Sequence, residues 1–100
     1  MISKAKIKYI RSLEQKKNRH NEGVFVAEGP KIVGDFLEIQ TAVFIACTAR
    51  WKADNTDWQY LKDTETTIVT DEELKKISFL QHPQEVLAIF RQAENKTTVP

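Results

Sequence analysis

The chain has 100 residues, a formal net charge of only +1, and 41% hydrophobic and 29% charged side chains, a balance typical of one small globular domain. No apolar run approaches the roughly 18 residues that a membrane-spanning helix needs, and Lys4, Lys6 and Lys8 interrupt the apolar core that a secretory signal requires. Cys47 is the only cysteine, which excludes an internal disulfide. We therefore expect a cytoplasmic protein.

The small net charge conceals an uneven distribution along the chain. Residues 1–20 carry seven basic side chains and one acidic side chain, a net charge of +6, whereas the other residues carry a net charge of −5. A basic segment at one end of a chain favours a polyanionic partner such as nucleic acid. A solvated, lysine-rich helix has the same composition, so charge alone leaves both interpretations open.

The first predicted element is an amphipathic helix over residues 3–17. Ser3 is a suitable N-cap, and Ile10 and Leu13 belong to a narrow apolar stripe at three-residue spacing, with basic side chains around it. A polar break follows at residues 18–23.

From residue 24 onward, runs of β-forming residues alternate with helical patterns. Pro30 suits the first turn of a helix, and Thr70 with Glu73 fits a capping box. The run at residues 42–47 is apolar almost without alternation, as in a strand covered on both faces. The predicted elements are a strand at 24–27, a helix at 30–39, a strand within 41–49, a polar loop at 51–54, a short helix around 57–62, a strand at 66–69, a helix from 70 or 71 to 78, and a strand at 86–90.

This order predicts an α/β fold, a three-layer αβα sandwich with a small mixed, mostly parallel sheet, preceded by the basic N-terminal helix. The fourth strand is expected to enter antiparallel, because its connection from the preceding helix is short. The expected organisation is a basic amphipathic helix and loop at 1–20, an αβα domain at 21–93 and a linker at 94–100.

Two stretches of the sequence match a known pattern. One runs from Ile7-Lys8-Tyr9-Ile10-Arg11-Ser12-Leu13 through Lys16-Lys17-Asn18-Arg19 to Gly23-Val24-Phe25-Val26-Ala27-Glu28-Gly29, and the other is His82-Pro83-Gln84-Glu85-Val86-Leu87-Ala88. In this order and spacing they resemble the N-terminal domain of SpoU-type (TrmH-type) RNA 2′-O-ribose methyltransferases of the SPOUT superfamily. That family commonly shows Pro-Gln-Gly-Val in the second stretch, so Glu85 stands where glycine is usual.

The resemblance implies a two-part enzyme. Its N-terminal substrate-binding domain has the αβα fold of ribosomal proteins that bind kinked RNA. A knotted C-terminal domain binds S-adenosylmethionine, forms a homodimer and carries the catalytic arginine, beginning with an Asn-x-Gly-x-x-x-Arg-like segment that this sequence lacks. The resemblance therefore implies that this chain is the substrate-binding part of a longer enzyme, that it holds no cofactor itself and that it is inactive alone.

The candidate RNA contacts are mainly cations. Ammonium and guanidinium groups neutralise phosphates and release counterions, and arginine can bridge two phosphate oxygens. Gly29 would permit a close approach of RNA or of another backbone segment, and Gln84 could form a hydrogen bond with a base. The predicted RNA-binding residues are Lys4, Lys8, Arg11, Lys16, Lys17, Arg19, Gly29 and Gln84.

Other polar and aromatic residues favour structural roles. Glu28 is expected to pair with Arg19 or to accept backbone N–H groups at the start of the following helix. Cys47 is expected in the core, and His20 and His82 lack the spacing of metal ligands. The aromatic side chains could stack on unpaired bases or cover an edge of the core, and we favour the core for Trp51, Trp58 and Tyr60. No catalytic, cofactor or metal site is predicted.

The function that these features favour is RNA positioning for a methyltransferase, with ribosomal RNA a better expectation than transfer RNA. Two alternatives stay open at this point. One is a standalone RNA-binding adaptor of the ribosomal-protein type, and the other is a protein-interaction domain whose basic helix binds an acidic partner.

Overall fold

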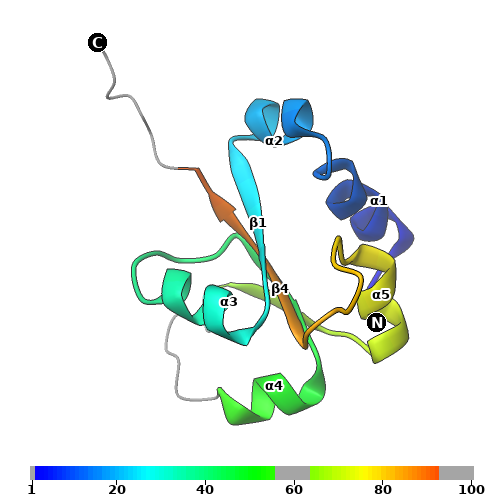
Figure 1. The fold of residues 1–100 in the computed structure, drawn as a ribbon, viewed down its shortest axis with the longest axis vertical. Helices are drawn as coiled ribbons and strands as arrows, with labels where there is room; N and C mark the ends of the chain where they lie inside the picture. The colour runs from blue at the N-terminus through cyan, green and yellow to red at the C-terminus, as the bar shows by residue number, and fades with distance from the viewer. Residues whose placement is uncertain (1, 56–63, 93–100) are drawn as a thin grey trace.

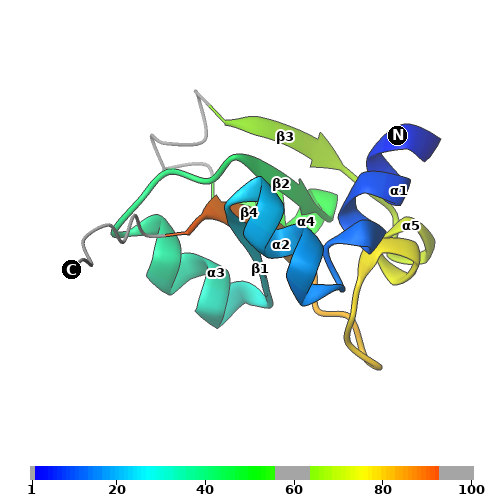
Figure 2. The same cartoon turned by 90° about the horizontal axis from the view of Figure 1, so that it is seen from above.

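A computed structural model describes residues 2–55 and 64–92. A four-stranded sheet lies between two layers of helices, as Figures 1 and 2 show from two directions. The elements are α1 (Lys4–Ser12), α2 (Lys16–Glu22), β1 (Val24–Glu28), α3 (Pro30–Leu37), β2 (Phe44–Cys47), α4 (Ala49–Asp54), β3 (Glu65–Ile68), α5 (Asp71–Ile77) and β4 (Val86–Arg91).

The sheet has the strand order β1-β4-β2-β3 and is mixed, as predicted. The fourth strand runs antiparallel to both of its neighbours, which confirms its expected direction, and β2 pairs with β3 in parallel. The expectation of a mostly parallel sheet was wrong. Because β4 lies in the middle of the sheet, its reversed direction makes two of the three strand pairings antiparallel.

The two faces of the sheet carry separate cores, which confirms the three-layer arrangement. Alternate residues of β4 point to opposite faces, so that Leu87 and Ile89 belong to one core and Val86, Ala88 and Phe90 to the other. The first core is covered by α1 and α5, which bury Ile10, Leu74 and Ile77, and by Leu13 just after α1. The second core is covered by α3 and α4, which bury Val33, Leu37 and Trp51.

The N-terminal segment is two helices rather than the single predicted helix over residues 3–17. The Ser3 N-cap is confirmed, because its Oγ accepts a hydrogen bond from the backbone N–H of Lys6 at 3.1 Å. However, α1 ends at Ser12, and α2 covers most of the predicted polar break before Gly23 ends it in a left-handed conformation with φ of 70°.

The other element predictions agree with the structure in kind, with two exceptions. All of β2 is buried, as its apolar run predicts, and the capping box of Thr70 and Glu73 is present. The predicted loop at 51–54 was wrong, because α4 starts at Ala49 behind a Thr48 cap, whose Oγ1 accepts from the N–H of Trp51. The helix predicted around 57–62 lies outside the described residues. Among the helices that the structure describes, none is long and apolar enough to cross a membrane.

Candidate nucleic-acid interface

The basic side chains of the N-terminal segment fall into two groups, one that has partners within the protein and one that has none among the described residues. Arg19, in α2, belongs to the first group. Its Nη1 donates hydrogen bonds to the carbonyl oxygens of Leu13 and Glu14 at 2.8 and 2.9 Å. These carbonyls follow the end of α1 and have no partner within the helix, so Arg19 caps α1 and fixes the turn into α2. It is therefore held by the protein's own backbone, and its contact with RNA stays a prediction.

Arg11 is also held by internal partners. Its Nη1 donates to the carbonyl oxygen of Ser78 at 3.2 Å, and its Nη2 lies 3.7 Å from a carboxylate oxygen of Glu14. The guanidinium carbon lies 5.6 Å from the centre of the Phe79 ring, within the range of a cation–π contact. Arg11 thus joins α1 to the segment after α5.

Lys6 lies at the edge of the core. Its Nζ lies 4.6 Å from the centre of the Phe44 ring and 3.5 Å from a carboxylate oxygen of Glu65. The N-terminal cations are therefore not all available to a ligand, and those that have internal partners include both arginines.

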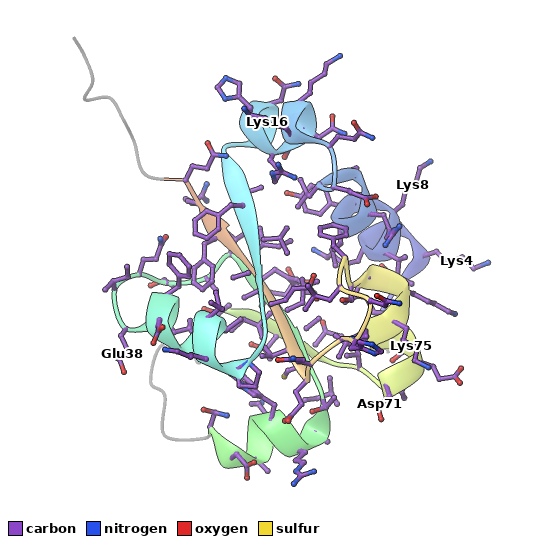
Figure 3. The ribbon with its side chains drawn as sticks, viewed as in Figure 1. Lys4, Lys8, Lys16, Glu38, Asp71 and Lys75 are labelled. Atoms are coloured by element: carbon purple, nitrogen blue, oxygen red, sulfur yellow. The ribbon has the colours of Figure 1, made fainter. Side chains whose placement is uncertain are left out.

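The other group consists of the exposed lysines Lys4, Lys8, Lys16 and Lys17, which we call the lysine surface. Within residues 2–55 and 64–92, none of these four side chains has a hydrogen-bond or ion-pair partner. Figure 3 shows Lys4 and Lys8 pointing outward from α1.

Sequence reasoning missed two further lysines beside this surface. Lys75 and Lys76 are exposed in the last turn of α5, where basic residues also stabilise the helix end. Helices α1 and α5 are in contact and lie side by side in both views of the ribbon (Figures 1 and 2). The sequence carries no signal of this contact, because the two helices are separated by most of the chain.

Gly29 and Gln84, which were predicted separately as RNA contacts, lie together in the fold. Gly29 is buried with φ of 95°, and a Cβ placed there would lie 3.2 Å from the Oε1 of Gln84. The backbone N–H of Gly29 donates to the carbonyl oxygen of Val86 at 2.9 Å. Glycine is therefore favoured here by the backbone conformation, and a Cβ would in addition press on the end of the Gln84 side chain.

Glu85 occupies a backbone conformation that favours glycine. Its φ is 62°, and the N–H of Val86 donates to the carbonyl oxygen of Gln84 at 2.6 Å across it, which is the bonding pattern of a γ-turn. The usual glycine of the resembled family stands at this position. Its physical role is thus to adopt this positive φ, which Glu85 adopts at some cost.

Glu28 has a structural role, as predicted, but its predicted partners were wrong. One carboxylate oxygen accepts from the hydroxyl of Ser78 at 2.6 Å, and the other accepts from the backbone N–H of Phe79 at 2.9 Å. Neither Arg19 nor the start of α3 is its partner, because Arg19 is engaged at the end of α1. No local signal could identify Ser78, which lies 50 residues further along the chain.

Trp51 and Cys47 lie in the core, as favoured by the sequence. Trp51 is 3% exposed, which excludes its side chain from stacking on a base, and Cys47 is fully buried. Burial raises the pKa of the Cys47 thiol to about 11, although the nearby Lys52 opposes the shift, so the thiol is not an activated nucleophile. Trp58 and Tyr60 lie outside the described residues. His20 and His82 are both exposed, His20 in α2 and His82 in the loop after α5.

Comparisons with known proteins agree with the fold and with the sequence pattern. The family model of the MRM3-like substrate binding domain matches residues 4–88. A protein from Porphyromonas gingivalis described as an RNA methyltransferase of the TrmH family superposes with a TM-score of 0.78 and 29% identity, covering 99% of this chain and 39% of that one. No curated protein matches the chain.

Two further solved structures are similar. The AdoMet-bound rRNA methyltransferase from Sinorhizobium meliloti has a TM-score of 0.75 and 26% identity, covering 93% of this chain and 35% of that one. An RNA 2′-O ribose methyltransferase at 18% identity shares the fold, with a TM-score of 0.69 over 98% of this chain and 38% of that one. The chain thus spans less than half the length of each of these structures, and it belongs to the family of MRM3-like substrate-binding domains of TrmH-type RNA methyltransferases.

Proposed function

We propose that this domain holds RNA, ribosomal rather than transfer RNA, for a methyltransferase domain in the same polypeptide. In this proposal the other domain transfers a methyl group from S-adenosylmethionine to a ribose 2′-hydroxyl and forms the homodimer, and the enzyme acts in the cytoplasm. The present domain contributes no catalytic group. The preference for ribosomal RNA is supported by the rRNA methyltransferase from Sinorhizobium meliloti, whose fold this chain shares.

The observation that carries the proposal is the lysine surface. Its four ammonium groups are exposed and have no internal partner among the described residues, so they keep their full capacity to neutralise phosphates. Lysine contacts of this kind hold the RNA backbone and read little sequence. Gln84 completes the proposed interface at the place where β1 and the loop before β4 meet, and the buried Gly29 lies against its side chain.

The test is the salt dependence of RNA binding by this chain. Replacing Lys16 and Lys17 by alanine should lower the slope of log K against log salt by roughly 0.7 to 0.9 for each phosphate that the variant no longer neutralises. The matched control replaces Lys31 and Lys52, which lie in α3 and α4 on the other side of the sheet, and it should leave the slope unchanged.

Three results would count against RNA binding at this surface. They are an affinity that does not depend on salt, equal effects of the two double variants, and no binding by the unaltered chain. The alternative of an acidic protein partner uses the same lysines, and it makes a different prediction. In that case polyglutamate should displace a bound hairpin RNA as effectively as a second RNA does.

A further inference from the structure

The loop of residues 78–85, between α5 and β4, is fixed at its start by a carboxylate from β1. The two oxygens of Glu28 accept from the hydroxyl of Ser78 and from the backbone N–H of Phe79, at 2.6 and 2.9 Å. The same hydroxyl oxygen accepts from the backbone N–H of Leu80 at 3.0 Å. One carboxylate therefore sets the direction in which three successive residues leave α5.

A second clamp comes from α1. Arg11 donates to the carbonyl oxygen of Ser78 and lies over the ring of Phe79. Together, Glu28 and Arg11 engage the N–H, the carbonyl, the hydroxyl and the ring of two adjacent residues. Two elements that lie far from this loop in the sequence, β1 and α1, thus converge on its start.

The end of the loop is fixed as well. Gln84 lies against Gly29, the γ-turn at Glu85 closes the chain, and the carbonyl oxygen of Glu85 accepts from the backbone N–H of Thr48 at 2.9 Å. The loop is thus held at both ends by β1, α1 and the start of α4, although it contains no helix or strand of its own.

Between these clamps the side chains face solvent. Leu80 is 44% exposed, Gln81 and His82 are exposed, and none of these three side chains makes a hydrogen bond or ion pair with the described residues. They comprise an apolar group, an amide with both donor and acceptor, and an imidazole ring. No lysine or arginine lies in residues 78–85, so this loop does not have the chemistry of a phosphate site.

We propose that residues 80–82 contact unpaired nucleotides of the RNA, and that Glu28 and Arg11 are positioning residues for this contact. Bases outside a helix expose a face for stacking on an imidazole or apolar side chain and an edge for hydrogen bonding to an amide. A loop already fixed in one conformation loses less entropy when it binds. This inference rests on the proposed function, since it assigns base contact to the loop and phosphate contact to the lysine surface.

The experiment compares two RNAs, a hairpin with an unpaired internal loop and the same hairpin fully paired, and measures the ratio of their affinities for this chain. The unaltered chain should prefer the unpaired RNA. The double change Gln81→Ala and His82→Ala should reduce that preference roughly fivefold or more, the effect of removing one stacked base. Both side chains are exposed, so the fold should not change.

Matched variants separate the roles. The control Gln15→Ala with His20→Ala removes the same residue types from exposed positions in the N-terminal segment and should leave the preference unchanged. Glu28→Gln should reduce the preference while the salt slope stays as in the unaltered chain, because it loosens the loop and leaves the lysine surface intact. Circular dichroism confirms that each variant is folded.

The outcomes distinguish this inference from the proposed function. If the loop variant and its control have the same preference, the base-contact role is wrong, even where the lysine variants still alter the salt slope. If the loop variant loses the preference but a folded Glu28→Gln does not, the positioning role is wrong. If the unaltered chain binds neither RNA, the proposed function itself fails.

Discussion

The lysine surface and the loop of residues 78–85 form two parts of one proposed interface and are built in opposite ways. The lysines are charged, lie on short helices, and have no partners among the described residues. The exposed side chains of the loop are uncharged up to Gln84, and the backbone that carries them is held by hydrogen bonds from distant segments. A surface that attracts a polyanion needs only exposed charge, whereas a surface that recognises a base needs a fixed geometry.

The same contrast divides the lysines from the arginines of the N-terminal segment. Arg11 and Arg19 present planar groups with several donors, and both use them on backbone carbonyls. The lysines of the surface have a single point charge on a long stem and remain in solvent. Basic composition alone therefore overstates the number of cations that a ligand can reach.

The largest expected effect is on stability. The lysine surface and the loop of residues 78–85 are held together by the packing of α1, and a change in the core beneath α1 should weaken that packing. Ile10 is fully buried in the core beneath α1 and α5. Ile10→Ala should lower the free energy of unfolding by about 2–5 kcal/mol, since it leaves a cavity in that core. Urea unfolding measures this decrease. Lys8→Ala, an exposed site in the same helix, should change stability by less than about 0.5 kcal/mol. Equal stability of the two variants would mean that α1 does not pack on the sheet.

A smaller effect sharpens the distinction between arginine and lysine. Arg19→Ala removes two hydrogen bonds to carbonyls at the end of α1 and should lower the free energy of unfolding by about 1–2 kcal/mol. Lys17→Ala should leave stability nearly unchanged. In RNA binding the order should reverse, with the salt slope lowered by Lys17→Ala and unaffected by Arg19→Ala. A lower slope in a folded Arg19→Ala variant would return this residue to the RNA contacts.

Local signals explain which parts of the fold could be predicted. The caps at Ser3 and Thr70 depend on residues three positions away, and the burial of β2 follows from its own apolar run, so each prediction was correct. The boundary between α1 and α2 was missed because the side chain of Arg19 satisfies carbonyls that a continuous helix would have used itself. The predicted loop at 51–54 was wrong because its polar residues indicated a loop, whereas Thr48 caps a helix there.

The candidate site shows the same limit more sharply. The lysines could be identified from the charge of the first 20 residues, since exposure is the usual state of a lysine. The partners of Glu28 and Arg11 could not be identified from the sequence, because Ser78 lies 50 residues from Glu28 and 67 residues from Arg11. Tertiary contacts of this separation leave no periodicity or motif in a single sequence. Gly29 and Gln84 were predicted from the properties of glycine and of an amide side chain, but their mutual contact is visible only in the fold.

The smallest expected effect concerns the backbone of the loop itself. Glu85→Gly should raise the free energy of unfolding by about 0.5–1 kcal/mol, because a left-handed conformation costs a non-glycine residue more than glycine's extra freedom in the unfolded chain costs. Glu85→Ala is the matched control, since it also removes the carboxylate but keeps the Cβ and hence the strained φ. Thermal unfolding of the two variants measures the free-energy cost of the positive φ at residue 85. Equal stability would show that the backbone of Glu85 is not strained. The two variants should bind RNA with equal affinity if only the charge of Glu85 affects RNA binding, since both remove the carboxylate. Tighter binding by the glycine variant alone would mean that the γ-turn sets the geometry in which residues 80–82 meet the RNA.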